Sequence, residues 1–102
     1  MNIDSYIKSV LATLMWREDR GDQLQGMTAC GLVVRNRVKA GWDGGDWVAV
    51  MTKHNQYSSM SVLGDSQTVV WGDYSDPLFE KVLYRVDDIY DGIYDDFTEG
   101  AL

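Results

Sequence analysis

The spacing of apolar residues predicts that the chain begins with an amphipathic helix. Apolar side chains recur at intervals of four, four and three residues, at Ile3, Ile7, Leu11 and Leu14. Residues spaced in this way form one stripe along a helix with 3.6 residues per turn. We therefore expect a helix over residues 4–19, with Asp4 or Ser5 as its N-terminal cap.

The same stripe places a carboxylate among the expected core residues. Four residues past Leu14 it reaches Glu18. An ionised carboxylate is costly to remove from water unless it is paired, and burial raises its pKa. A carboxyl that keeps its proton near neutral pH can act as a general acid. Two interpretations stay open here: Glu18 is such an acid, or it turns out to solvent from the last helical turn, as glutamates usually do.

A second helix is predicted from Asp22 to a stop at Gly41. Its apolar positions recur at helical spacing, at Leu24, Met27, Cys30, Gly31, Val34 and Val38. Gly26 and Gly31 weaken a helix by propensity, which indicates a close approach of another backbone, such as that of the first helix. Because only Arg20-Gly21 separates the two helices, they should form a hairpin.

The middle of the chain changes character. Residues 43–46, Asp-Gly-Gly-Asp, predict a turn, and Asp46 can cap a short helix over residues 47–52. Between residues 53 and 76 helical periodicity stops. Short apolar and β-branched pieces predict at most a small sheet there, from residues 56–58, 60–62 and 68–71.

A strong helix start follows at Asp76-Pro77, because aspartate caps a helix and proline suits its first position. The apolar face then continues to Gly92, through Leu78, Val82, Leu83, Val86, Ile89 and Tyr90. Residues 95–102 are predicted to form a terminal loop. The expected fold class is therefore α+β but mostly α, with a helical hairpin, a small β or loop region and a C-terminal helix.

Composition narrows the choice of function. The chain has 102 residues, 45% of them apolar, which suits one domain over residues 1–102. Its net charge of -7 argues against nucleic-acid binding, which requires a basic face, but is compatible with a basic protein partner. The N-terminus lacks the pattern of a signal peptide, and no apolar run is long enough to span a membrane. One His and one Cys cannot make an ordinary zinc site, and we expect neither a metal nor a cofactor.

Several motifs occur in a fixed order along the chain. They are Leu14-Met15-Trp16-Arg17-Glu18-Asp19-Arg20-Gly21-Asp22, Gly26-Met27-Thr28-Ala29, Val34-Arg35-Asn36-Arg37-Val38, Trp42, Gln56-Tyr57-Ser58, Asp76-Pro77 and Asp96-Phe97-Thr98-Glu99-Gly100-Ala101. In this order and spacing the chain resembles the spore-cortex-lytic (SleB/CwlJ-like) family of cell-wall hydrolases over most of its length.

The resemblance implies a lysozyme-like domain that cleaves the glycan strands of peptidoglycan, without a cofactor. It maps the catalytic acid of the family onto Glu18. It also implies that Gln56, Tyr57, Ser58 and Thr98 bind substrate, and that Arg20 and Asn36 are supporting residues. The motifs fix no second catalytic carboxylate, which indicates a lytic transglycosylase. An ordinary glycoside hydrolase requires a second carboxylate about 5–9.5 Å from the first.

The chain also departs from the family. Arg17 stands where the family has glycine, Asp19 where it has alanine, and Phe97 where it has proline. Family members continue past the Gly-Ala motif with an aromatic-rich segment, whereas this sequence stops at Leu102, so the domain is expected to be truncated at its C-terminus. A cation beside Glu18 would lower its pKa and an anion would raise it.

Two functions from different classes follow. The first is a phage or prophage lysin, made in the cytoplasm and acting on the cell wall after release, or carried in the virion. The second is a non-catalytic descendant of the fold, a phage structural or inhibitory protein whose acidic surface binds a virion protein or another protein.

Overall fold

The structure is mostly helical. It is a computed structural model of the chain, and it describes residues 2–18, 23–53 and 75–102. Helices make up 76% of these residues, and none of them lies in a strand. The elements are α1 (Ile3–Glu18), α2 (Gln23–Lys39), the 3₁₀ turn η2 (Trp42–Gly45), α3 (Trp47–Thr52) and α4 (Pro77–Asp91). The mostly α prediction is confirmed, while the predicted strand segments at 56–58, 60–62 and 68–71 lie outside the described residues.

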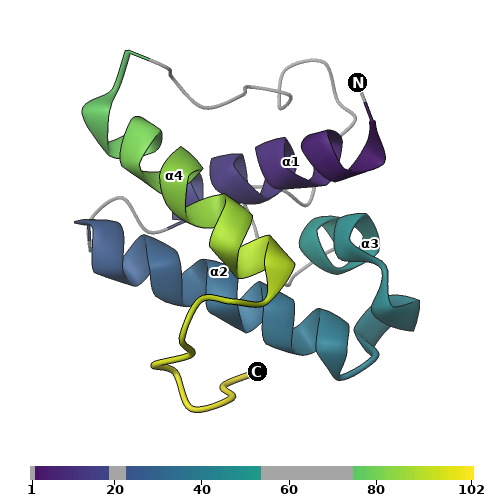
Figure 1. Cartoon of the computed structure of the whole chain (residues 1–102). Helices are drawn as coiled ribbons and strands as arrows, with labels where there is room; N and C mark the ends of the chain where they lie inside the picture. Colours follow the sequence, from purple (N-terminus) through teal and green to yellow (C-terminus); the bar gives the residue numbers. More distant parts are fainter. Residues whose placement is uncertain (1, 19–22, 54–74) are drawn as a thin grey trace.

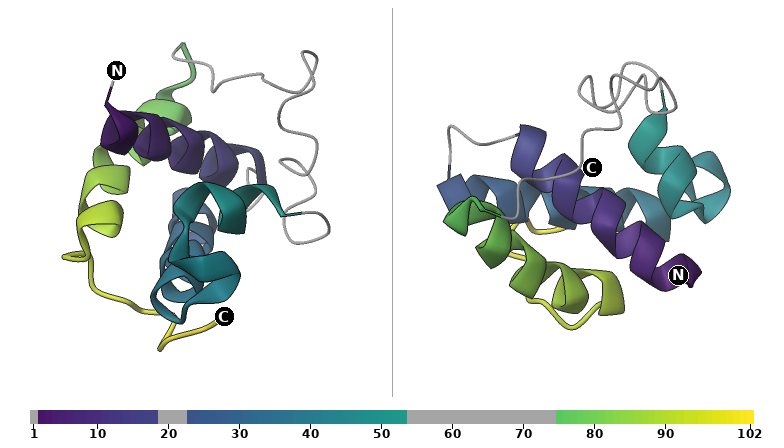
Figure 2. Two further views of the ribbon diagram at one scale, coloured as in Figure 1. Left: turned by 90° about the vertical axis from the view of Figure 1, so that its right-hand side faces the viewer. Right: turned by 90° about the horizontal axis from the view of Figure 1, so that it is seen from above.

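Three long helices form the body of the molecule. Helices α1, α2 and α4 pack against one another in pairs, and the short α3 packs on α1 and α2 beside the end of α2 (Figures 1 and 2). After α4 the chain passes in front of α2 and then lies below it (Figure 1). Residues 94–102 contact Arg35, Asn36 and Arg37 in the C-terminal half of α2. In the part of the chain that the structure describes, no helix is both long and apolar enough to cross a membrane.

Helix α1 begins earlier and is buried more completely than its stripe predicts. The side chain of Asn2 accepts a hydrogen bond from the backbone N of Ser5 at 2.8 Å. Asn2 is therefore the cap, and the prediction of Asp4 or Ser5 was wrong. Seven consecutive residues, 10–16, are buried, whereas Ile3 is 65% exposed. These buried residues lie on all sides of the helix, so burial is not confined to one apolar stripe. The stripe therefore does not predict whether a residue after position 16 is buried.

Gly31 allows three helices to meet closely. A Cβ atom at this position would lie 2.6 Å from Met15 Sδ on α1 and 3.2 Å from Ile89 Cδ1 on α4. The prediction that another backbone approaches this glycine was wrong, because the close neighbours are side chains of α1 and α4. Met15 and Ile89 are both fully buried, so the contact lies within the hydrophobic core.

The predicted starts of α3 and α4 are confirmed. Asp46 accepts hydrogen bonds from the backbone N atoms of Val48 and Ala49, and Asp76 accepts one from Leu78 N, with Pro77 at the first helical position. At the other end of α4, Gly92 has a φ of 80°, in the left-handed region. Glycine adopts this conformation without the steric penalty of a side chain and ends the helix.

Asp76 also makes a contact that the sequence does not reveal. Its Oδ2 accepts a hydrogen bond from Trp16 Nε1 at 2.9 Å, and the Trp16 ring meets Phe79 edge-on, with 5.5 Å between centroids. One carboxylate therefore caps α4 and ties its first turn to the end of α1.

This double role predicts that Asp76→Ala destabilises the protein more than a simple cap mutation does. Loss of the cap costs about 0.5–2 kcal/mol, and loss of a hydrogen bond to a charged group adds about 1.5–3 kcal/mol. Asp46→Ala is the matched control, because it removes the cap of α3. Denaturant unfolding of both variants measures the difference, and equal losses would show that the Trp16 contact contributes nothing.

Candidate functional site

The structure places two of the predicted site residues and leaves the others outside its description. Glu18 is the last residue of α1, but its side chain is not described. Arg20 and residues 56–58, which comprise Gln56, Tyr57 and Ser58, lie outside the described residues. Asn36 and Thr98 are described, and they lie together. The roles assigned to these residues stay predictions.

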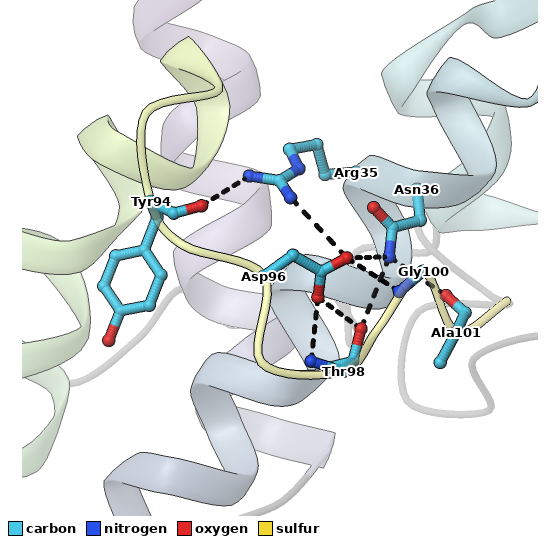
Figure 3. A network of polar contacts seen from close by, with 7 residues as sticks. All are labelled: Arg35, Asn36, Tyr94, Asp96, Thr98, Gly100 and Ala101. Atoms are coloured by element: carbon cyan, nitrogen blue, oxygen red, sulfur yellow. Dashed lines mark hydrogen bonds and ion pairs between the residues drawn. The ribbon is translucent and has the colours of Figure 1, made fainter.

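Asn36 is the centre of a polar network between α2 and the segment after α4 (Figure 3). Its amide nitrogen donates to Asp96 Oδ2 at 3.0 Å and to the carbonyl oxygen of Ala101 at 3.2 Å. The hydroxyl oxygen of Thr98 lies at 3.4 Å from the same nitrogen. An amide group has only two N–H donors, so these three acceptors share them. Asn36 thus joins two motifs that are 60 residues apart.

Asp96 folds the segment around its own carboxylate. Oδ1 accepts hydrogen bonds from the backbone N of Thr98 at 2.9 Å and from the Thr98 hydroxyl, and Oδ2 accepts one from Gly100 N at 3.0 Å. An aspartate that accepts from the backbone two residues on forms an Asx turn. The turn ends in two residues with positive φ, Glu99 at 57° and Gly100 at 80°.

These hydrogen bonds keep Asp96 ionised. The Thr98 hydroxyl is the largest cause, and Asn36 and the two backbone N–H groups add to it; together they outweigh partial desolvation and lower the pKa of Asp96 to about 2. Hydrogen bonds to a carboxylate favour its charged form. Asp96 is therefore an anionic acceptor at neutral pH and has no proton to donate.

Arg35 brings a buried cation to the same place. It is 5% exposed, donates from one terminal nitrogen to the carbonyl oxygen of Tyr94 at 3.0 Å, and has the other 3.9 Å from Asp96 Oδ2. Its Nε is buried and has no hydrogen-bond partner among the described atoms. A buried cation requires an anion and hydrogen-bond acceptors nearby, and Tyr94 and Asp96 supply them.

Arg37 fixes the end of the segment. Its Nε and a terminal nitrogen donate to the carbonyl oxygen of Leu102 at 3.1 and 2.8 Å. Its guanidinium also lies over the Trp42 ring, 4.7 Å from the centroid. Three consecutive residues of α2, Arg35, Asn36 and Arg37, therefore hold residues 94–102, and we call these contacts the α2 clamp.

The α2 clamp positions a segment; its groups are not arranged for acid–base catalysis or for binding a metal. The carboxylate of Asp96 is held as an anion by several hydrogen-bond donors. One of these donors is the hydroxyl group of Thr98. Among residues 2–18, 23–53 and 75–102, no group of three His, Cys, Asp or Glu residues could hold a metal ion. Sequence reasoning missed the parts played by Arg35 and Asp96. The Asp-x-Thr-x-Gly pattern of residues 96–100 was the available signal for the turn.

Comparison of the chain with protein families, curated proteins and solved structures found no match. The resemblance therefore depends on the motifs in the sequence.

The lowered pKa of Asp96 predicts a specific loss of stability in acid. The folded-state pKa of about 2 lies below the ordinary value of 3.8, so the stabilisation is fully present above about pH 4 and disappears as the pH falls through 2. Asp96→Asn should be less stable than the parent at about pH 5, because its amide group faces other donors, and the difference should narrow toward about pH 2.

Denaturant unfolding across this pH range measures the effect. Asp95→Asn is the control, because the neighbouring Asp95 is exposed. A pH-dependent difference of the same size in this control would contradict the assignment to Asp96.

Proposed function

We propose that the chain cleaves the glycan strands of peptidoglycan in the manner of a lytic transglycosylase, with Glu18 as the general acid. The proposal starts from the motif resemblance. The observation that supports it is the α2 clamp, because residues 34–38 and 96–101, two of the motifs behind the resemblance, contact each other directly. Motifs that belong to one domain of this family should be joined in this way.

A second observation concerns the helix end that carries Glu18. Trp16, two residues earlier, is hydrogen-bonded to Asp76 and packed against Phe79, so the end of α1 is fixed to the start of α4. A catalytic carboxyl works best on an element that packing holds in place. The last turn of α1 meets this requirement.

In the proposed reaction one carboxyl serves twice. Glu18 protonates the glycosidic oxygen as the bond to the muramyl anomeric carbon breaks. The 6-hydroxyl of the same sugar then attacks that carbon, and the Glu18 carboxylate takes the hydroxyl proton. The product is a 1,6-anhydro sugar, and no water is consumed. In this proposal Gln56, Tyr57, Ser58 and Thr98 bind the strand.

The runner-up is a non-catalytic descendant of the fold that binds another protein. The net charge of -7 is compatible with this alternative. A turbidity assay on purified peptidoglycan separates the two functions, because only the first clears the suspension.

The chemistry predicts the ends of the products. Sacculi digested by the protein should contain anhydromuramyl ends in mass spectra, because an internal hydroxyl replaces water. Reducing ends alone would mean that water is the nucleophile, and would require a second carboxylate, for which Asp19 is the first residue to test.

Glu18→Gln should abolish cleavage without unfolding the protein. The amide keeps the shape of the side chain but has no acidic proton, and general acid catalysis contributes about 10²–10⁴-fold, so the rate should fall at least about a hundredfold. The melting temperature should stay equal or rise at neutral pH, since a catalytic carboxyl held away from water opposes stability.

Glu80→Gln is the matched control, because Glu80 is exposed in the first turn of α4. It should leave the rate unchanged and lower the melting temperature only slightly, because a negative charge in the first turn of a helix is mildly stabilising. Clear destabilisation by Glu18→Gln would instead indicate that Glu18 holds a buried ion pair, and unchanged cleavage would rule it out as the acid.

A further inference from the structure

The outward face of α4 combines exposed apolar side chains with unpaired carboxylates. Tyr84 is 75% exposed and Ile93 is 70% exposed. Asp88 and Asp91 follow Tyr84 by four and seven residues, so all three lie on one side of the helix. The backbone N of Ile93 donates to Asp88 O at 3.0 Å, which places Ile93 beside the acidic end. We call these four residues the α4 outer face; in Figure 1, α4 lies in front of α1 and α2.

Among the described residues the carboxylates of this face form no ion pair, although Lys8 is near enough to Asp91 for their charges to interact. Lys81 lies on the same side of the helix, two turns before Asp88. The neighbouring Asp87 pairs with Lys8 at 3.0 Å. In contrast, no Lys, Arg or His of the described residues lies within ion-pair distance of Asp88 or Asp91. Arg85, one turn before Asp88, instead donates to the Thr28 hydroxyl at 2.9 Å.

These acids also oppose the stability of α4. Asp88 and Asp91 lie in its last turn, where the helix dipole is negative, and that turn contains no basic residue. Negative side chains at this end, close to one another, are unfavourable. The charge of Lys8 offsets this only from a distance, since Lys8 pairs with Asp87. Places where a sequence breaks such a local rule are often functional.

We propose that the α4 outer face binds a basic segment of another protein, in which Lys or Arg side chains alternate with apolar ones. The cations would pair with Asp88 and Asp91, and the apolar side chains would cover Tyr84 and Ile93. Exposed tyrosines are common anchors of such interfaces. A second copy of this chain is a poor occupant, since its net charge is also -7, and the same charge repels nucleic acid and anionic lipid. The inference does not depend on the chemistry of Glu18.

A direct test uses a fluorescent synthetic amphipathic peptide of lysine and leucine, an oligolysine of equal charge, and fluorescence anisotropy with the purified chain. The amphipathic peptide should bind more tightly, and its affinity should fall with added salt. Replacing both acids, Asp88→Asn with Asp91→Asn, should weaken binding about tenfold, and Tyr84→Ala should weaken it at least about fivefold.

The matched control removes the same charge elsewhere, by Asp95→Asn with Glu99→Gln, two exposed residues of the segment after α4. It should leave the affinity within about twofold. The Asp88 and Asp91 double variant should melt at the same temperature or higher, because it relieves the unfavourable charge at the helix end.

Several results would overturn the inference. Equal weakening by the control, or equal binding of oligolysine, would mean that only net charge matters. Unchanged peptide affinity of the Tyr84→Ala variant would show that Tyr84 is not an anchor of the interface. Tighter binding to anionic vesicles or duplex DNA, or a dimer in sedimentation lost on Tyr84→Ala, would assign the face to another occupant.

Discussion

The close packing of α1, α2 and α4 at Gly31 is the contact around which the described helices are arranged. Gly31 lies against Met15 of α1 and Ile89 of α4, and both contacts are too short to admit a methyl group without movement. Helix α4 ends at Gly92, three residues after Ile89. The chain that leaves Gly92 therefore meets α2 beside Arg35, where the α2 clamp begins.

The core and the clamp follow different physical rules. The three helices are joined by buried apolar side chains. Packing of such side chains requires that their volumes fill the space between the helices, and it depends little on the direction of any one contact. The clamp is joined by hydrogen bonds, which require each donor to face an acceptor. Arg35 belongs to both, because its stem is buried among the helices and its guanidinium reaches Tyr94 and Asp96. The packing of the helices thus places the Arg35 guanidinium beside the turn in residues 94–102.

Local signals in the sequence predicted the helices well. The starts of α3 and α4 were set by Asp46, Asp76 and Pro77, whose effect reaches only a few residues. The cap of α1 was missed because Asn2, Asp4 and Ser5 are all capping residues, and propensity alone does not choose among them. The mostly α class followed from the same periodicity, whereas the predicted strands fall outside the described residues.

The candidate site was less predictable, because its contacts join distant parts of the chain. The pairing of Asn36 with Asp96 spans 60 residues, and the choice of Asp96 over the adjacent Asp95 depends on which carboxylate faces α2. Periodicity also brought Glu18 to attention through a single stripe, but residues 10–16 are buried on every side of α1. The assignment of Glu18 as the acid therefore depends more on the family motif around it than on its position on the stripe.

The α2 clamp has a consequence for the variability of the segment it holds. Arg35, Asn36 and Arg37 contact the main-chain oxygens of Tyr94, Ala101 and Leu102, and every amino acid has such an oxygen. The clamp holds Asp96 and Thr98 through their side chains, and the Tyr94 side chain packs against the core beside Arg85. The positive φ of Glu99 and Gly100 restricts those two positions as well. The exposed positions held only through the main chain, such as Leu102, are therefore the ones free to drift during evolution, or to be redesigned, while the chain keeps the same path along α2.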